Sequence, residues 1–332
     1  MKNRGSILVI TIWILMLLSL LALGLSYRMG IELKLVGYNT DHLKAFYTAK
    51  AGVLRTILEL QNDFTKEYDG YKENWGNNRE AFKNYKLGEG RFTIKSTYVT
   101  EENDFLLGAV DEQSKINLNK ASVKVLEALL ELIEEDKEIA TNILDWIDKD
   151  SKAGNQGEGF GAEDGFYEGL GKRYPCKNKP IEILEELLMI KDISQDIYTR
   201  IKNYLTIYGD GLININTASG LVLKALGLEE SLTEKIIEYR AGEDNLEGTP
   251  DDQLFTDLYK MIKILDEEVG LDSKEVVSLN NLLAKKPSLL SLKSDYFRII
   301  SEGKVGKIKK NIEVVIKRDK QQYPEILFWK EQ

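Results

Sequence analysis

The most prominent feature of the hydropathy pattern is an apolar run near the amino terminus. Residues 7–25 carry no charge, and 13 of these 19 positions are Leu, Ile or Val. As a helix rising about 1.5 Å per residue, the run spans roughly 28 Å, the thickness of a hydrocarbon core. Because Lys2 and Arg4 precede it, the run is predicted to cross a membrane with the bulk of the chain outside the cytoplasm.

The helical pattern continues beyond the apolar run. From residue 28 to residue 61 there is no proline, and apolar residues such as Leu43, Val53 and Ile57 recur at helical spacing. Glycines in this stretch weaken a helix without ending it. The pattern predicts one helix over 6–61, roughly 80 Å long, apolar at its start and amphipathic at its end. A plain signal-anchor is the alternative that hydropathy alone leaves open.

Strand patterns lie on both sides of a long helical stretch. Five segments alternate or cluster apolar residues at strand length: 89–99, 105–113, 295–306, 307–319 and 325–332. Strands, then helices, then strands again indicate an α+β fold in which the long helix packs on an antiparallel sheet and a large helical domain is inserted. The predicted boundaries are 62–115 with 291–332 for the α/β domain and 116–290 for the insertion.

The predicted insertion contains an internal repeat. Residues 116–132 align with 213–229, and each copy places Asn-x-Asn-x-Ala-Ser before an apolar-periodic segment. A second helix is predicted after each copy. Four side chains are candidate helix caps, which would satisfy backbone N–H groups that otherwise lack a partner: Asn119, Ser122, Asn216 and Ser219.

The repeated phrase resembles helix-hairpin-helix and SAM-like modules, some of which bind DNA. Such a module holds a phosphate with backbone N–H groups at a Gly-x-Gly hairpin. Here the hairpins read "LIEEDKE" and "LGLEESL", which place carboxylates where phosphate oxygens would lie. The net charge of −9 also disfavours nucleic acid as a partner. We therefore expect no nucleic-acid binding, and DNA binding through these modules is the alternative.

Composition narrows the chemistry further. The chain of 332 residues is 43% hydrophobic and 30% charged, as in folded proteins. Cys176 is the only cysteine, so no internal disulfide can form. His42 is the only histidine and is distant in sequence from the acidic clusters, which argues against histidine zinc sites and Ser-His-Asp triads. We expect no enzymatic activity.

Two acidic loops are candidate metal sites. Asp145, Asp148 and Asp150 close a predicted helix, and Glu163 and Asp164 follow a glycine-rich loop. Asp145 and Asp148 are three positions apart and are therefore predicted to share a face of that helix. Dense carboxylates repel one another, and an oxygen-only ligand set favours Ca²⁺ over zinc. A second loop offers Glu243, Asp244, Asn245, Asp251 and Asp252. Neither has EF-hand spacing, so solvated acidic loops are an alternative, as is a carboxylate pair doing glycosidase-type chemistry.

The chain resembles the K-type minor pseudopilins of type II secretion systems along nearly its whole length. The resemblance is carried by the charged leader ending in Gly5, by "DWIDKD" with "GAEDGFY", by "DEQSKINLN" and "PIEILEEL", and by the closing strands. It implies a pilin-like fold and cleavage by prepilin peptidase after Gly5, which makes Ser6 the first mature residue. Ile10 stands where most pilins have Glu, and Ser6 replaces the usual aromatic residue or Met. The missing Glu is typical of the K-type subunit.

The resemblance also implies a cellular location, a position in the pseudopilus and a set of binding partners. A K-type subunit is held in the inner membrane by one helix, with its carboxyl-terminal domain in the periplasm, and it caps the tip of the pseudopilus. The implied partners are the I- and J-type minor pseudopilins, the major pseudopilin, prepilin peptidase and the inner-membrane assembly platform. The resemblance assigns Ca²⁺ to the first acidic loop, with the second loop as a further candidate. Two alternatives remain. One is a type IV pilus or competence minor pilin that contacts DNA through the repeated modules, and the other is a membrane-anchored hydrolase that uses the acidic clusters.

Overall fold

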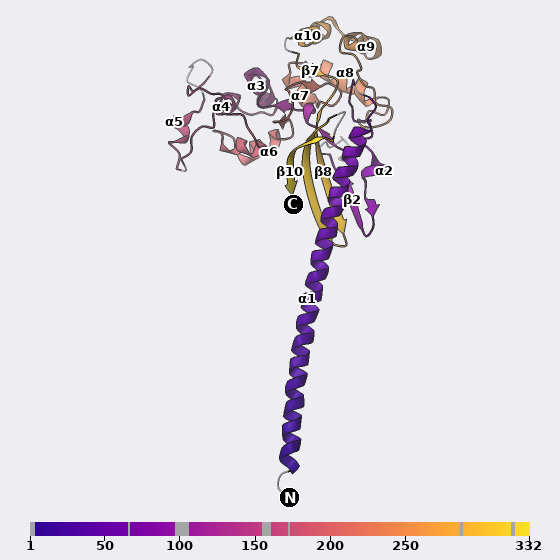
Figure 1. The fold of residues 1–332 in the computed structure, drawn as a ribbon. Helices are drawn as coiled ribbons and strands as arrows, with labels where there is room; N and C mark the ends of the chain where they lie inside the picture. The colour runs from indigo at the N-terminus through magenta and orange to yellow at the C-terminus, as the bar shows by residue number, and fades with distance from the viewer. Residues whose placement is uncertain are drawn as a thin grey trace.

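A single helix dominates the shape of the molecule. The computed structural model describes residues 4–65, 67–96, 106–154, 161–171, 173–285, 288–319 and 323–332. Helix α1 (Arg4–Gln61) has 58 residues and extends as a rod away from the rest of the chain (Figure 1). The predicted unbroken helix is confirmed, and it runs through Gly30 and Gly37, which have open space around them. Within the described ranges it is the one helix long and apolar enough to cross a membrane.

The two halves of α1 have different surroundings. All side chains from Ser6 to Thr40 are exposed. Beyond them, one face of the helix is buried against the sheet, with Ala45, Ala49, Val53, Ile57 and Leu60 pointing inward. This face recurs every three or four residues, which is the helical period expected of an amphipathic segment. The amphipathic end predicted from the sequence is therefore the part of α1 that belongs to the folded domain.

A six-stranded antiparallel sheet packs on this half of α1. Its strand order is β1-β2-β8-β9-β10, and β3 pairs with β8 beside β2. Strands on either side of the helical part thus meet in one sheet, which confirms the predicted α+β fold. The bounds are β1 (Tyr85–Leu87), β2 (Gly90–Ile94), β3 (Val110–Asp111), β8 (Tyr296–Val305), β9 (Ile308–Lys317) and β10 (Glu325–Glu331), and the short helix α2 (Arg79–Phe82) precedes β1.

Gly303 in β8 allows α1 to lie directly on the sheet. A Cβ atom at this position would be 2.2 Å from the carbonyl oxygen of Ala45 and 2.4 Å from the backbone nitrogen of Ala49. Ser301 adds a hydrogen bond of 2.7 Å from its hydroxyl to the carbonyl oxygen of Ala49. The helix therefore touches the strand backbone to backbone, and its exposed half is a direct continuation of the packed half.

One predicted strand is largely wrong. Of the described residues 106–113, only Val110–Asp111 form a strand, and the 3₁₀ helix η1 (Glu112–Ser114) follows at once; residue 105 lies outside the described part. The strand ends here because the Asp111 carboxylate accepts a hydrogen bond from the N–H of Gln113 and turns the chain out of the sheet. The strand predicted at 89–99 is β2 over 90–94, and residues 97–99 lie outside the described part of the chain.

The residues between β3 and β8 form a helical part with its own hydrophobic core, separate from the core between α1 and the sheet. Helices α3–α6 lie to one side of the sheet, and α7–α10 lie above it (Figure 1). The bounds are β4 (Ile116–Asn117), α3 (Val123–Leu132), α4 (Glu138–Ile147), α5 (Asp164–Tyr167), η2 (Leu184–Met189), α6 (Gln195–Ile201), β5 (Leu205–Thr206), β6 (Ile213–Asn214), α7 (Gly220–Ala225), α8 (Glu230–Ala241), α9 (Met261–Glu268), α10 (Ser273–Leu283) and β7 (Leu290–Ser291).

The sequence repeat corresponds to two similar units. Each begins with a two-residue parallel bridge, β4 with β5 and β6 with β7, and continues into a helix pair. Helix α3 packs against α4, α7 packs against α8, and the leading helices α3 and α7 pack against each other. The assignment of these units to helix-hairpin-helix or SAM-like modules stays a prediction.

Serines, not asparagines, stand at the helix N-caps. Ser122 precedes α3, and Ser219 precedes α7 and accepts a hydrogen bond of 3.4 Å from the N–H of Val222. Of the predicted caps, the Asn119 and Asn216 options are therefore wrong.

Asn119 and Asn216 instead bind distant backbone. The side chain of Asn119 donates to the carbonyl of Ile181 (3.0 Å) and accepts from the N–H of the same residue (2.8 Å). Asn216 makes the same pair of bonds to Phe255, at 3.0 and 2.9 Å. Each amide thus substitutes for a β-strand neighbour and fixes a connecting segment to the start of its repeat. We call these two arrangements the amide clamps.

Candidate metal centre

Asp145 organises the first acidic loop from inside the fold. It lies near the end of α4 and is buried, and its carboxylate accepts hydrogen bonds from the N–H groups of Gly154 (3.1 Å) and Ala162 (2.9 Å). Gly161 has φ +137°, and a Cβ atom there would be 2.0 Å from Asp145 Oδ2, so glycine is required. Burial raises the pKa of Asp145, and the two N–H groups oppose this. Asp145 therefore joins the two described ends of the glycine-rich loop, whose residues 155–160 lie outside the described part.

Three other acids of this loop converge. Carboxylate oxygens of Asp148, Asp150 and Glu163 lie within 4.8 Å of one another. The N–H of Asp150 donates to Asp148 Oδ1 (3.2 Å), so the chain curls and turns both aspartates to the same side. We call these three residues the acidic cluster. Their convergence depends on residues 13 or more positions apart in the sequence, which the helix spacing of Asp145 and Asp148 did not predict.

Glu163 is the member of the acidic cluster that most requires a partner. Its side chain is only 7% exposed, and neither carboxylate oxygen has a hydrogen-bond partner among the described residues. Burial, followed by the charges of Asp145 and Asp148, raises the pKa of Glu163 to about 7. A buried carboxylate without donors, facing other carboxylates, is the condition that a bound cation relieves.

Two buried aromatic side chains that are close in sequence to the acidic cluster pack against each other. Trp146 and Tyr167 pack edge to face with ring centroids 5.1 Å apart, and both are buried. Tyr167 closes α5, so it fixes the helix that begins directly after Glu163. Asp164 is not in the acidic cluster, because its Oδ1 accepts a hydrogen bond of 2.7 Å from the N–H of Cys176. The thiol of Cys176 is buried, which raises its pKa to about 11 and makes it a packing group.

The residues of the first loop thus divide into two roles. Asp145 and Asp164 hold the loop to the core through backbone N–H groups, whereas the acidic cluster presents carboxylate oxygens that lie close to one another. An oxygen-only set that includes a buried glutamate suits a hard cation of the calcium type. The exposed side of Asp148 and Asp150 leaves room for water as further ligands.

In the second acidic loop, carboxylates accept hydrogen bonds from backbone N–H groups of the same loop. Asp251 accepts hydrogen bonds from the N–H groups of Glu243 (2.8 Å) and Asp244 (3.1 Å), and Asp252 accepts from Gly248 (2.7 Å). Asn245, with φ +57°, forms the tight turn between them. Among the residues that the structure describes, this loop holds no group of three converging carboxylates. The second candidate site therefore has less structural support than the first.

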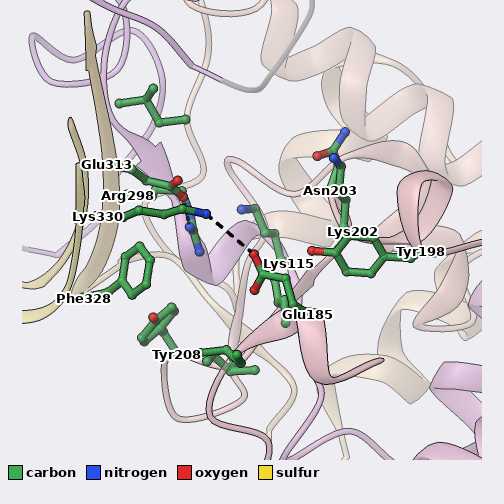
Figure 2. Close-up of a pocket in the computed structure, with 14 residues that line it drawn as sticks. Lys115, Glu185, Tyr198, Lys202, Asn203, Tyr208, Arg298, Glu313, Phe328 and Lys330 are labelled. Carbon is green, nitrogen blue, oxygen red and sulfur yellow. Dashed lines mark hydrogen bonds and ion pairs between the residues drawn. The ribbon is translucent and has the colours of Figure 1, made fainter. Parts of the chain in front are cut away.

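A cleft of about 270 Å³ lies between the sheet and the helical part (Figure 2). Glu112 is fully buried behind it, 2.7 Å from Arg298 Nε and 2.9 Å from Lys115 Nζ. Burial opposes ionisation of Glu112, but the charges of Arg298 and Lys115 outweigh it and hold the pKa of Glu112 below its usual range. Lys330 faces Glu185 at 4.0 Å across the cleft. These paired charges join the two parts of the protein and give no catalytic arrangement.

Comparisons with known proteins agree with this architecture. A family model described as "Type II secretion system (T2SS), protein K" matches residues 102–210. Type II secretion system protein K of Aeromonas hydrophila is 26% identical, covering 96% of this chain and 94% of the relative. The protein of that name from Pseudomonas aeruginosa is also 26% identical, covering 92% and 91%.

The fold has a solved counterpart. A chain in the crystal structure of the GspK–GspI–GspJ complex from the type 2 secretion system of enterotoxigenic Escherichia coli matches with a TM-score of 0.64 and 19% identity. The match covers 90% of this chain and 99% of that one. The long helix, the antiparallel sheet, the inserted helices and these comparisons agree on one conclusion: this chain is similar to the protein K subunits of type II secretion systems along nearly its whole length.

Proposed function

We propose that the chain is a minor pseudopilin that acts at the tip of the type II secretion pseudopilus and contributes by assembly, not catalysis. The observation that carries the proposal is the construction of α1. Its first half is bare and apolar, its second half is packed on the sheet, and no break separates them. A simple anchor needs no such rigid connection, whereas a filament subunit needs the membrane segment to be continuous with its folded head.

The amino terminus is proposed to be processed by prepilin peptidase. Gly5 and Ser6 lie in the first turns of α1, directly before the apolar run. Coexpression with a prepilin peptidase should remove residues 1–5, which intact-mass measurement detects directly, and Gly5→Val should prevent the loss. An unshortened wild-type chain in the presence of active peptidase would instead identify α1 as a plain signal-anchor.

A position at the tip is supported by shape and charge. Helices α3–α6 project to one side of the sheet, away from α1 (Figure 1), and would obstruct packing in a filament shaft. Ile10 provides no carboxylate, the group that in other pilins neutralises the amino terminus of the subunit above. A subunit with nothing above it has no use for that group. By analogy with the E. coli complex, the proposed direct partners are the I- and J-type minor pseudopilins, with the major pseudopilin below.

Copurification tests the proposed partners. The tagged full-length chain, coexpressed with I- and J-type subunits and solubilised in mild detergent, should retain both subunits, and immunogold labelling should place it at filament ends. Ile10→Glu should reduce tip labelling, while Ile14→Glu, one turn further along, controls for a charge in the membrane. Labelling along the filament shaft would contradict the tip position. A salt-sensitive DNA complex with no I- or J-type subunit would favour the alternative of a DNA-contacting minor pilin.

The periplasmic head is proposed to bind Ca²⁺ through the acidic cluster. Asp148, Asp150 and Glu163 are the ligands, and Asp145 and Asp164 fix the loop that presents them. Calcium added to the full-length chain in detergent after EDTA treatment should raise its melting temperature. Asp148→Asn should reduce that rise by the part that the acidic cluster contributes, whereas Glu138→Gln, an exposed acid at the other end of α4, should keep the full rise. Equal melting temperatures of the wild-type chain in EDTA and in calcium would reject the metal claim and leave the pseudopilin proposal standing.

A further inference from the structure

The chain just after α1 connects all three parts of the molecule. Asp69 is fully buried, and its N–H donates to the carbonyl of Leu292, where the helical part returns to the sheet (2.8 Å). Asp69 Oδ2 accepts from the N–H of Ser294 and from Arg318 Nη2, both at 2.7 Å. Arg318 follows the end of β9, and its Nη1 donates to Asp63 Oδ2 at 2.9 Å. The rod, the sheet and the helical part therefore meet at this point.

Negative charge at this junction exceeds the positive charge that the described residues supply. Carboxylate oxygens of Asp63, Asp69 and Glu73 lie within 4.8 Å of one another. Arg318 is the cation paired with two of them. Lys72 is nearby, but its Nζ donates to the carbonyl of Asp252 at 2.7 Å. With all three acids ionised, one guanidinium leaves two negative charges without compensation in a largely buried position.

Two further observations indicate a missing ligand. Asp69 is 0% exposed, and its Oδ1 has no hydrogen-bond partner among the described residues. Thr65 Oγ1 lies 2.7 Å from Asp63 Oδ1 and is also in close contact with Glu73 Oε1. A hydroxyl has one proton, so it can donate to only one of these carboxylates, and the second contact needs either a proton on the carboxyl group or a cation that both oxygens bind.

Two of the three acids, Asp63 and Glu73, line an open pocket, and Asp69 is buried behind them. Asn62 and Thr65 also line this pocket, with Lys72 at its side. We propose that Asp63, Asp69 and Glu73, with the Thr65 hydroxyl, form a second divalent-cation site, for Ca²⁺ or a similar hard cation, that ties the end of α1 to the helical part. Oxygen ligands from acids and a hydroxyl match the preference of such ions. The proposal is independent of the proposed function, because it concerns different residues from the acidic cluster.

A shared proton is the rival way to neutralise these acids. Burial raises the pKa of Asp69 to about 7 and also raises the pKa of Glu73, so protonation near neutral pH would relieve the same repulsion. The two explanations differ in whether the protein holds a metal ion at this junction.

Terbium luminescence separates the two explanations, because Tb³⁺ replaces Ca²⁺ and is sensitised by nearby tryptophan. Trp75 Nε1 donates to Glu73 Oε2 at 2.9 Å, so Trp75 is adjacent to this site. The test uses the full-length chain in detergent at pH 7.5, with Asp148→Asn to disable the acidic cluster. This variant should still show sensitised Tb³⁺ emission that calcium displaces. Adding Glu73→Gln should weaken that binding at least tenfold, and Glu59→Gln, an acid that lines the same pocket but is paired with Arg55, is the matched control.

Either of two results would overturn the site. One is an Asp148→Asn variant that shows no calcium-displaceable Tb³⁺ emission, since that measurement requires no change at the junction. The other is a folded double variant whose Tb³⁺ affinity equals that of the Asp148→Asn parent. Equilibrium dialysis with calcium provides a count: the wild-type chain should hold one ion more than the Glu73→Gln single variant, and an equal count would identify the shared proton as the neutralising group.

Discussion

Glu163→Gln should stabilise the protein in the absence of metal and destabilise it relative to the wild-type chain when calcium is present. At pH 8 without metal, Glu163 is ionised in a position that raises its pKa from the usual 4.5 to about 7. Each pKa unit corresponds to about 1.4 kcal/mol, so the folded state bears a cost of up to about 3 kcal/mol. Asp148 and Asp150 face water, which screens part of the repulsion, and we expect a net cost of about 1–2 kcal/mol. The neutral, similarly shaped Gln removes this cost.

In calcium, the wild-type chain should be more stable than the Glu163→Gln variant. At a calcium concentration of about 100 times the dissociation constant, binding adds about 2.7 kcal/mol to the free energy of unfolding of the wild-type chain. The variant lacks the buried ligand of the acidic cluster and loses this contribution, whereas calcium bound at the junction of Asp63, Asp69 and Glu73 would stabilise both chains equally. In EDTA the variant should therefore melt above the wild-type chain, and in calcium it should melt below it.

Thermal unfolding of both full-length chains in the same detergent, at pH 8 with EDTA or with calcium, provides the measurement. Glu138→Gln should follow the wild-type chain in both conditions. If Glu163→Gln is the less stable protein in EDTA as well as in calcium, then Glu163 makes favourable contacts of its own, and the argument from an unpartnered buried carboxylate is wrong.

Three further changes test other parts of the fold. Asn216→Ala leaves a buried N–H and a buried carbonyl unpaired and should cost about 2–4 kcal/mol in the free energy of unfolding, whereas Asn119→Ala, at a half-buried clamp, should cost about half as much. Gly303→Ala forces α1 off the sheet and should cost 2 kcal/mol or more, while Gly165→Ala, with open space around it, should stay within about 0.5 kcal/mol by the same chemical unfolding assay. The pKa of Glu112 is lower in the folded state than in the unfolded state. Its contribution to the free energy of unfolding is therefore present above the unfolded-state pKa near 4.5 and is lost as the pH falls below that pKa. Glu112→Gln should therefore cost about 3 kcal/mol at pH 7 and show a smaller loss of stability between pH 5 and pH 3 than the wild-type chain.

Elements defined by local periodicity could be predicted from the sequence, and α1 is the clearest case. Its apolar face recurs at helical spacing over many turns, and no proline interrupts it, so the predicted end at residue 61 agrees with the structure. Strands β8, β9 and β10 alternate strongly enough to be located for the same reason. The strand predicted at 105–113 is limited to Val110–Asp111, and the side chain of Asp111 ends it by accepting a hydrogen bond from the backbone two residues later. Apolar content predicts burial at such a place, but not whether the buried backbone is a strand.

Roles that depend on distant partners could not be predicted from the sequence. The amide clamps join residues 62 and 39 positions apart. Both asparagines precede helices, so their local position suggested caps and gave no sign of the long-range bond. For the same reason Asp145 and Asp148, three positions apart, were expected to act together. In the structure, Asp145 instead points inward to the loop backbone, and Asp148 lies close to Glu163. For the amide clamps, the sequence signal was the repeated Asn-x-Asn-x-Ala-Ser phrase, which indicated that Asn119 and Asn216 have equivalent roles.

The position of Asp111 explains how the helical part is held in one orientation. This fully buried carboxylate accepts hydrogen bonds from Thr217 Oγ1 (2.5 Å), Ser294 Oγ (2.6 Å) and Asn214 Nδ2 (3.2 Å). It lies where the chain leaves the sheet, and its donors come from the second repeat and from the segment that returns to β8. A buried carboxylate is costly without such donors, so any rotation of the helical part that separates them is opposed by several kcal/mol. In the proposed tip subunit, contacts made by the helical part are therefore transmitted to α1 as to a single rigid body, which a flexibly tethered domain could not do.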